Sequence, residues 1–224
     1  MNIRQVPSPN FYDLTDNPHI LVLHTTLGAF NGAVEHLTST KTGVSAHYVF
    51  GRNEGEIAQL VTLDKGAWHA GVISNPSARG KKAMKRDAFW NFQNPNKYSI
   101  GFEFAAGYDI DRDGILESWE QAYTTAQIRN SVKVLVDVIE PALGYTFQNP
   151  NILTHKDITS YKPELEAQRT LFIAELGRYR IEKILLENLL PEKIDEVKAK
   201  KPSSLKEDFA ELRTLVDRII TTHG

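Results

Sequence analysis

Short apolar runs, separated by polar or helical segments, mark the first three quarters of the chain. Residues 20–23 read ILVL, and such a wholly apolar run predicts a strand buried on both faces. Within residues 98–104, Ile100, Phe102 and Phe104 occupy alternate positions, which is the period of a strand. Residues 151–154 predict a further short strand. These segments therefore indicate a sheet with a buried interior.

Two β-rich runs, residues 44–50 and 56–61, are joined by a glycine-containing loop and predict an antiparallel hairpin. Residues 125–139 and 165–176 carry apolar residues at helical spacing. Residues 72–98 are polar and interrupted by prolines and glycine, so we expect a long surface loop there. Strands that alternate with helices predict an α/β fold, with a mixed central β-sheet flanked by helices.

The last forty-odd residues have a different character. Residues 178–200 and 204–222 predict two helices, the second opened by a capping box of Ser204 and Glu207. We therefore expect a domain of residues 1–177 and a small helical C-terminal region of residues 178–224. That region could serve packing or oligomerisation, and the oligomeric state is open.

Composition excludes several classes of function. The 26 basic and 28 acidic residues give a net charge of −2, so no basic field argues for nucleic acid. No apolar run approaches the ~18 residues of a membrane span, and the first residues lack a secretory signal. We therefore expect a chain that is cytoplasmic as synthesised. Since there is no cysteine, any metal must be bound by histidine and carboxylate.

Two histidines follow predicted strands directly, His24 after residues 20–23 and His155 after residues 151–154. Side chains at the same end of adjacent strands can converge on one point. A carboxylate from the segment after His155 would complete a His/His/carboxylate set, which leaves the fourth position of a catalytic zinc open to water. Taken singly, each histidine could instead be an ordinary core or loop residue.

Five motifs occur in order along the chain: LVLHTT (21–26), SAHYVFGRNEGEIAQLV (45–61), KGAWHAGV (65–72), YSIGFEF (98–104) and ILTHKDIT (152–159). Together they resemble the zinc-dependent N-acetylmuramoyl-L-alanine amidases of the type-2 family, which are related to peptidoglycan recognition proteins. The resemblance covers about residues 6–176. It implies one catalytic zinc, peptidoglycan or muropeptides as partners, and hydrolysis of the amide between N-acetylmuramic acid and L-alanine.

The resemblance also assigns the metal ligands residue by residue. His24 and His155 match two zinc ligands of the family. Glu164 stands where the family usually carries Asp or Cys, two residues after Lys162, and Asp157 is the alternative third ligand. Glutamate is acceptable to zinc, although the loop must accommodate its additional methylene.

Four further residues receive roles from the same resemblance. Glu103 matches a catalytic glutamate that moves a proton, and Lys162 would stabilise the oxyanion. Glu103 could instead be an exposed strand carboxylate or an ion-pair partner, and Lys162 a solvated loop lysine. Trp68 and His69 match a motif that lines the cleft, where they would contact substrate; Trp68 could equally be a core residue.

Residues 109–120 satisfy the D-x-D-x-D-G-x5-E pattern of a calcium loop. The oxygen ligands of a structural Ca²⁺ would come from Asp109, Asp111, Asp113, Ile115, Glu117 and Glu120. An acidic turn without metal is the alternative.

Of the biological roles that the resemblance allows, we expect a phage-type endolysin, with a cytosolic recycling amidase as the alternative. A phage-type endolysin, which would act on the cell wall after release, is favoured by the helical C-terminal region as a wall-targeting element. A cytosolic amidase that recycles anhydro-muropeptides is favoured by VPSPNF (6–11), which is similar to the start of such enzymes. A non-catalytic peptidoglycan-binding module and a metal hydrolase of another amide are further alternatives.

Overall fold

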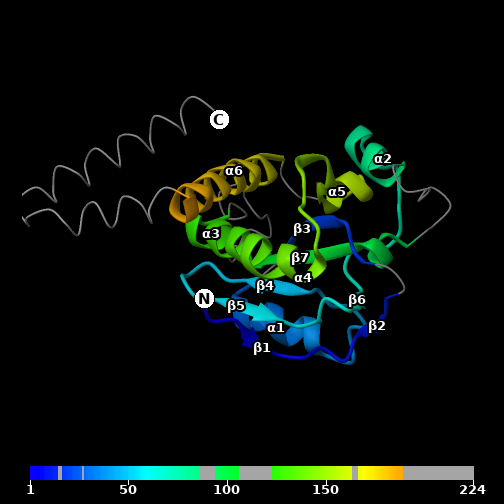
Figure 1. Ribbon diagram of the computed structural model, residues 1–224. Helices are drawn as coiled ribbons and strands as arrows, with labels where there is room; N and C mark the ends of the chain where they lie inside the picture. Colours follow the sequence, from blue (N-terminus) through cyan, green and yellow to red (C-terminus); the bar gives the residue numbers. More distant parts are fainter. Residues whose placement is uncertain (15–16, 27, 86–93, 106–122, 163–165, 189–224) are drawn as a thin grey trace, which may run out of the picture. The chain divides into compact units, whose positions relative to one another are not determined.

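Figure 1 shows the protein as a computed structural model, which describes residues 1–14, 17–26, 28–85, 94–105, 123–162 and 166–188. The chain divides into two compact units, Met1–Leu171 and Phe172–Gly224. The predicted domains 1–177 and 178–224 stay a prediction, and the two units are described separately. Among the described helices, none has the length and apolar character needed to cross a membrane.

A six-stranded sheet with the order β1-β5-β4-β7-β3-β8 forms the centre of the first unit. Its strands are β1 (Arg4–Gln5), β3 (Ile20–Thr26), β4 (Tyr48–Phe50), β5 (Ile57–Gln59), β7 (Ser99–Ala105) and β8 (Ile152–Thr154). The predicted hairpin is confirmed as the antiparallel pair β4 and β5, while all other neighbours run parallel. The mixed sheet expected from the sequence is therefore correct.

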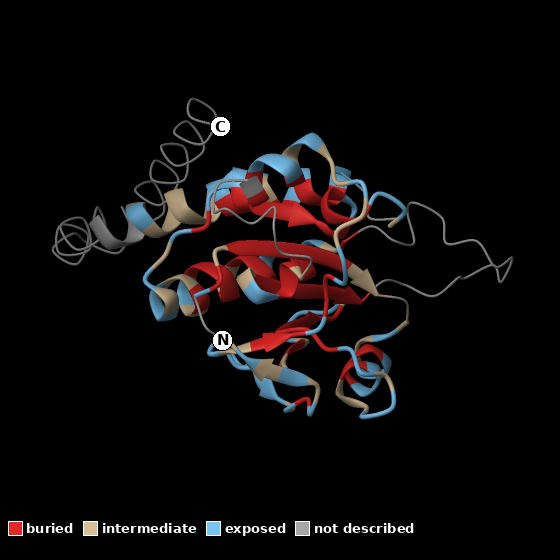
Figure 2. Cartoon of the chain, turned by 90° about the vertical axis from the view of Figure 1, so that its right-hand side faces the viewer, coloured by how far each residue is buried: buried red, intermediate tan, exposed pale blue. Residues whose placement is uncertain are grey.

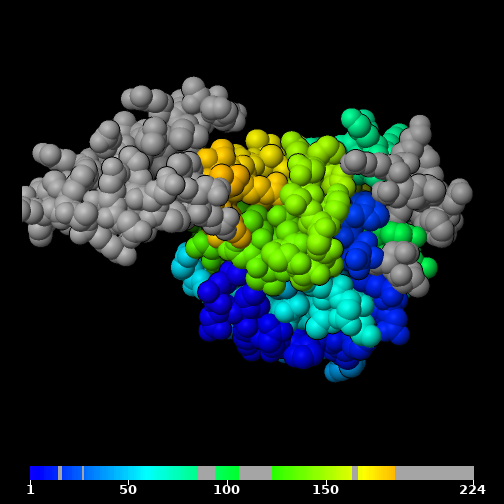
Figure 3. Space-filling model, viewed as in Figure 1, coloured from blue at the N-terminus to red at the C-terminus, as the bar shows by residue number. Residues whose placement is uncertain are grey.

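β4 and β7 are buried along their whole length and β3 as far as His24, which Figure 2 shows as red ribbons. β1 closes one edge beside β5, and the blue N-terminal residues lie next to cyan ones on the surface in Figure 3. A second, two-stranded sheet pairs β2 (Phe11–Asp13) with β6 (Lys65–Ala67).

The two faces of the central sheet differ in chemistry. In β3 and β7, Leu23 pairs with Phe102 and His24 with Glu103, and paired residues point to the same face. One face, the aromatic face, carries Tyr48, Phe50, Phe102 and Phe104. The other face, called here the histidine face, carries Val22, His24, Val49 and Glu103. Successive residues of one strand thus serve a core and a polar site.

Helices cover both faces. On the histidine face, α1 (Phe30–Thr38) packs Val34 and Leu37 against Val49. Met84 of α2 (Ala78–Lys85) and Ile158 of α5 (His155–Ile158) pack against Val22. On the aromatic face, Tyr123 stacks on Phe104 just before α3 (Thr125–Val134), which a capping box opens.

Three elements refine the expectations. The predicted helix 125–139 is α3 continued by a π-helical turn, η3 (Leu135–Ile139), and a short α4 (Glu140–Leu143). The loop expected over residues 72–98 is wrong in part, because α2 and the 3-10 helix η2 (Pro95–Tyr98) lie within it. α6 runs without a break from Glu166 to Asn188, so the helix expected over residues 165–176 continues into the first part of the one expected from residue 178.

In the second unit, the described residues are the later turns of α6, where Arg178 bonds Glu175 and Glu182. The helix predicted over residues 204–222 and most of that over 178–200 lie outside the described residues.

Candidate active site

His24 lies near the end of β3, buried on the histidine face with 2% of its surface exposed. The apolar residues before it place the strand between two neighbours, so the side chain cannot reach bulk water. Its Nε2 lies 2.9 Å from Nδ1 of His69. The His69 ring has room because residue 101 is glycine: a Cβ there would lie 2.5 Å from Cγ of His69. A glycine in β7 therefore lets His69 pack against the strand beside His24.

His155 is the first residue of α5, immediately after β8. Thr154 and Asp157 form the capping box of this helix, in which the Asp157 carboxylate accepts from the amide and hydroxyl of Thr154. The other oxygen of Asp157 accepts from Ser77 and Arg79. Both oxygens are thus used in the protein, so Asp157, the alternative third metal ligand, has a structural role instead.

His24 and His155 meet, as predicted: their Nδ1 atoms lie 3.0 Å apart. The other nitrogen of His155, Nε2, lies 3.0 Å from the carbonyl oxygen of Ala70. A carbonyl only accepts, so Nε2 of His155 carries the ring proton. A neutral imidazole has one N–H, and Nδ1 of His155 therefore presents a lone pair to His24.

The proton on His24 follows from a chain of bonds. The Ser99 hydroxyl donates to the carbonyl of Pro95, so it must accept from Nε2 of His69, 3.2 Å away. Nδ1 of His69 then has a lone pair and accepts from Nε2 of His24. This leaves Nδ1 of His24 unprotonated as well. Two lone pairs consequently face each other at 3.0 Å, an arrangement that a bound cation would stabilise.

Burial keeps these imidazoles neutral. It lowers the pKa of His155 to about 4, and the Lys162 ammonium lowers it as well. The pKa of His24 lies well below its ordinary value because of burial first, and then because of His155, His69 and Lys162. Neutral imidazole is the form that binds a metal ion, so the site holds its ligands in the required state across the neutral pH range.

Glu103 and Lys162 complete the part of the predicted site that the structure describes. Glu103 is in register with His24 on the neighbouring strand, points to the same face, and is 8% exposed. The ammonium of Lys162 lies close enough to lower the pKa of both His24 and His155. The structure thus brings together His24, Glu103, and the His155 and Lys162 pair from three separate parts of the sequence.

Trp68 and His69 differ in accessibility. Trp68 is 38% exposed, and its ring centroid lies 4.5 Å from that of Tyr12. His69 is 9% exposed and uses both ring nitrogens within the protein, toward His24 and Ser99. Trp68 therefore offers a surface to a ligand, whereas His69 orients His24. The substrate contacts expected of both residues stay a prediction.

Other predicted site residues lie outside the described residues. These are Glu164, and the calcium ligands Asp109, Asp111, Asp113, Ile115, Glu117 and Glu120. Over the described ranges, no group of three or more His, Asp and Glu side chains is arranged to hold a metal ion. Two of the three predicted ligands, His24 and His155, are there. Nitrogen ligands of tetrahedral zinc, at Zn–N distances of about 2.0–2.1 Å, lie roughly 3.3 Å apart, so these two fit zinc after a small movement.

The sequence matches known proteins over most of the first unit. A family model described as N-acetylmuramoyl-L-alanine amidase (Amidase_2) matches residues 14–166. N-acetylmuramoyl-L-alanine amidase A of Achromobacter lyticus is 30% identical over 63 residues, which are 28% of this chain and 36% of that protein. The 1,6-anhydro-N-acetylmuramyl-L-alanine amidase AmpD of Citrobacter freundii is 37% identical over 90 residues, 32% of this chain and 48% of that protein. The chain thus spans about half or less of the length of these two relatives.

The fold also matches a solved structure. A selenomethionine derivative of AmpD superposes with a TM-score of 0.51 at 27% sequence identity. The match covers 78% of this chain and 93% of the AmpD chain. The mixed sheet with its flanking helices is therefore shared with this solved structure.

Proposed function

The chain belongs to the N-acetylmuramoyl-L-alanine amidase family, and from this premise we propose that it hydrolyses the amide between N-acetylmuramic acid and L-alanine with the help of one zinc ion. The observation that carries the proposal is the pair of unprotonated nitrogens, Nδ1 of His24 and Nδ1 of His155, which face each other at 3.0 Å. Bonds to Ala70 and, through His69, to Ser99 fix both tautomers. Buried lone pairs in this arrangement repel one another unless a cation or a proton lies between them.

His24, His155 and Glu164 would hold the metal, with Glu164 assigned by the family pattern alone. When bound, zinc would supply a Lewis acid that polarises the amide carbonyl and makes water nucleophilic at neutral pH. His69 would support the metal indirectly: by accepting from Nε2 of His24, it holds that ring in the tautomer and orientation that binding would require.

Glu103 would take the proton of the attacking water and deliver it to the leaving amine. Its place in register with His24 puts the carboxylate on the face where the ligands meet. Its low exposure strengthens this role, since a nearly buried carboxylate interacts with few competing waters. Lys162 would stabilise the negative charge that develops on the amide oxygen, supported by its electrostatic effect on both histidines.

Product analysis on purified peptidoglycan tests the proposal. The metal-loaded protein should release new L-alanine amino termini without new reducing sugars. Chelator should stop the release, and zinc should restore it. Binding without cleavage would instead indicate a peptidoglycan-binding module, and cleavage elsewhere a hydrolase of another amide.

The same assay on soluble anhydro-muropeptides tests a second candidate role. The endolysin proposed from the sequence should prefer the intact wall. The similarity to AmpD, at 37% identity over 90 residues, favours a recycling amidase that acts on soluble 1,6-anhydro products. A ratio of the two specificity constants, measured on one preparation, distinguishes the roles.

A further inference from the structure

The segment that follows the Trp68-His69 motif runs along the segment that follows His155. The Thr159 hydroxyl donates to the Val72 carbonyl at 2.8 Å, and Ser74 exchanges backbone bonds with Ile158 and Ser160 at 3.1 Å each. The Ser77 amide donates to the Asp157 carbonyl at 3.0 Å. This series of bonds holds residues 155–162, called here the metal-site loop, against residues 72–77, which lead directly into α2.

The backbones of α2 and α5 approach closely at Gly80. A Cβ at Gly80 would lie 2.0 Å from the carbonyl oxygen of Asp157. Glycine therefore permits a backbone approach that no other residue would tolerate. The approach brings the first turn of α2, and with it Arg79, over the carboxylate of Asp157.

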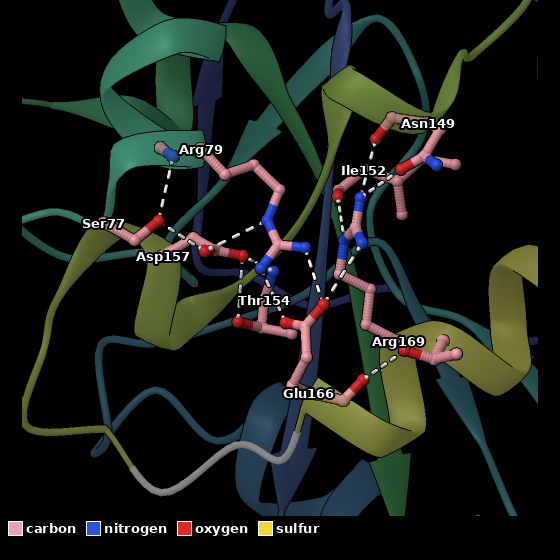
Figure 4. A network of polar contacts seen from close by, with 10 residues as sticks. Ser77, Arg79, Asn149, Ile152, Thr154, Asp157, Glu166 and Arg169 are labelled. Carbon is pink, nitrogen blue, oxygen red and sulfur yellow. Dashed lines mark hydrogen bonds and ion pairs between the residues drawn. The ribbon is translucent and has the colours of Figure 1, made fainter.

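Arg79 bonds two carboxylates, Asp157 and Glu166, which stand before and after Lys162 in the sequence (Figure 4). Its Nε donates to Asp157 at 3.2 Å, and its two terminal nitrogens donate to the two oxygens of Glu166 at 2.7 and 2.6 Å. Asp157 lies two residues after His155, and Glu166 lies four residues after Lys162. A single planar guanidinium thus ties together the two flanks of the segment that carries Lys162.

Glu166, the second carboxylate bonded by Arg79, is itself held in place by Arg169. Arg169, 6% exposed, donates to Glu166 at 3.3 Å, to the Ile152 carbonyl at 2.7 Å and to the Asn149 carbonyl at 2.9 Å. Ile152 begins β8, the strand that ends in front of His155. Arg169 therefore holds Glu166 to β8, and Arg79 holds Glu166 to Asp157.

We propose that Arg79 is a positioning residue for the metal site: it binds Asp157, the capping residue of the helix that begins at His155, to Glu166 and thereby fixes the ring of His155. The inference rests on the proposed function, because it assumes that His155 binds zinc. Arg79 is none of the predicted metal ligands; it acts by holding Asp157 and Glu166 at a set separation. Residues that orient metal ligands from outside the coordination sphere typically contribute 10–100-fold to metal affinity or activity.

The test is the zinc affinity of the full chain, measured by competition with a chromophoric chelator, in Arg79→Ala and Arg79→Lys. We expect Arg79→Ala to weaken zinc binding by about 10–100-fold and to lower kcat at saturating zinc more than it changes KM. Arg79→Lys should lie between Arg79→Ala and the wild type, since an ammonium cannot bond Asp157 and both oxygens of Glu166 at once.

Arg178→Ala is the matched control. Arg178 also lies between two carboxylates, Glu175 and Glu182, and its side chain is 31% exposed against 29% for Arg79. Zinc affinity should be unchanged in this variant. If Arg79→Ala lowered the melting temperature but kept wild-type zinc affinity and kcat, Arg79 would be purely structural and the inference overturned.

Should Arg79→Ala not fold, Arg79→Lys and Glu166→Gln decide the question, and wild-type zinc affinity in both would overturn the inference. Failure of the proposed function has a different signature: the wild type itself would bind no zinc, or would bind it and cleave no amide. A wild type that binds zinc and cleaves, beside an Arg79→Ala variant with equal affinity and kcat, contradicts the role of Arg79 alone.

Discussion

The two faces of β3 and β7 are built from alternate residues of the same strands, yet they perform opposite tasks. On the aromatic face, Leu23, Phe102 and Phe104 are fully buried and contribute hydrophobic free energy. On the histidine face, His24 and Glu103 are also buried, although transferring such groups from water costs free energy unless each polar atom is bonded. The same alternation that buries the phenylalanines thus points the catalytic candidates to the opposite, also buried, face.

The comparison teaches where stability and chemistry are located. The histidines keep their buried polar atoms bonded: His24 donates to His69, and His155 donates to the Ala70 carbonyl. The phenylalanines of the aromatic face need no such partners. Changes on the histidine face should therefore alter metal binding and turnover, whereas changes on the aromatic face should alter the free energy of unfolding.

The largest effect is expected from His155→Ala. Removing one of the two converging nitrogens should abolish zinc binding and lower turnover by about 10³-fold or more, because both the Lewis acid and its position are lost. Zinc content of the purified variant and product analysis measure this. His36→Ala, at an exposed position of α1, is the control and should bind zinc normally. Retained turnover in His155→Ala would contradict the proposed metal centre.

Glu103→Gln separates proton transfer from metal binding on the histidine face. The amide keeps the size of the carboxylate but cannot take a proton, so kcat should fall by about 10²–10⁴-fold. Zinc affinity and the melting temperature should stay close to those of the wild type. Single-turnover assays at saturating zinc measure the loss. A variant with wild-type kcat would assign Glu103 to the alternative, an ion-paired strand carboxylate.

Phe102→Ala should give the converse result. Its side chain lies between the rings of Tyr48 and Phe50 on the aromatic face and is 0% exposed. Truncation of such a residue should lower the free energy of unfolding by about 3–5 kcal/mol, through lost burial and the remaining cavity. Urea unfolding measures the loss, with Phe11→Ala as control because Phe11 is 49% exposed.

Turnover per folded, zinc-loaded molecule of Phe102→Ala should be near that of the wild type. If instead the variant folded well and lost its activity, the two faces would be coupled and the division of tasks between them would be wrong.

Much of the sheet could be predicted because its signals are local. The apolar run before His24 and the alternation around Phe102 specify strands, and the ordered motifs gave the family. The histidine convergence was also predictable, since His24 and His155 each follow a strand of the same sheet. In these strands, the alternation of residue types in the sequence matches the alternation of side chains between the two faces of the sheet.

Other features depend on contacts between distant residues. α2 was expected to be a loop because of Pro76 and Gly80, yet Gly80 is there for its close approach to Asp157. The pairing of Arg79 with Glu166 joins residues 87 positions apart, which no local pattern reveals.

One structural role could have been read from the sequence. Thr154 and Asp157 have the spacing of a capping box directly after a strand, and this signal would have removed Asp157 from the candidate metal ligands.

The smallest predicted effect concerns His47, a buried histidine beside the site that binds no metal in our proposal. Its Nδ1 accepts from the Gly101 amide and its Nε2 donates to the Lys65 carbonyl, so it is neutral, and burial lowers its pKa to about 4. Between pH 6.5 and 4 the unfolded chain therefore binds a proton that the folded chain excludes. The stability that this group contributes is complete above pH 6.5 and is lost as the pH falls, by about 2 kcal/mol between pH 7 and 5.

Urea unfolding of the chelator-treated wild type and of His47→Gln at both pH values measures this loss. The variant should lose about 2 kcal/mol less than the wild type, and equal losses would show that the histidine face accommodates the charged ring.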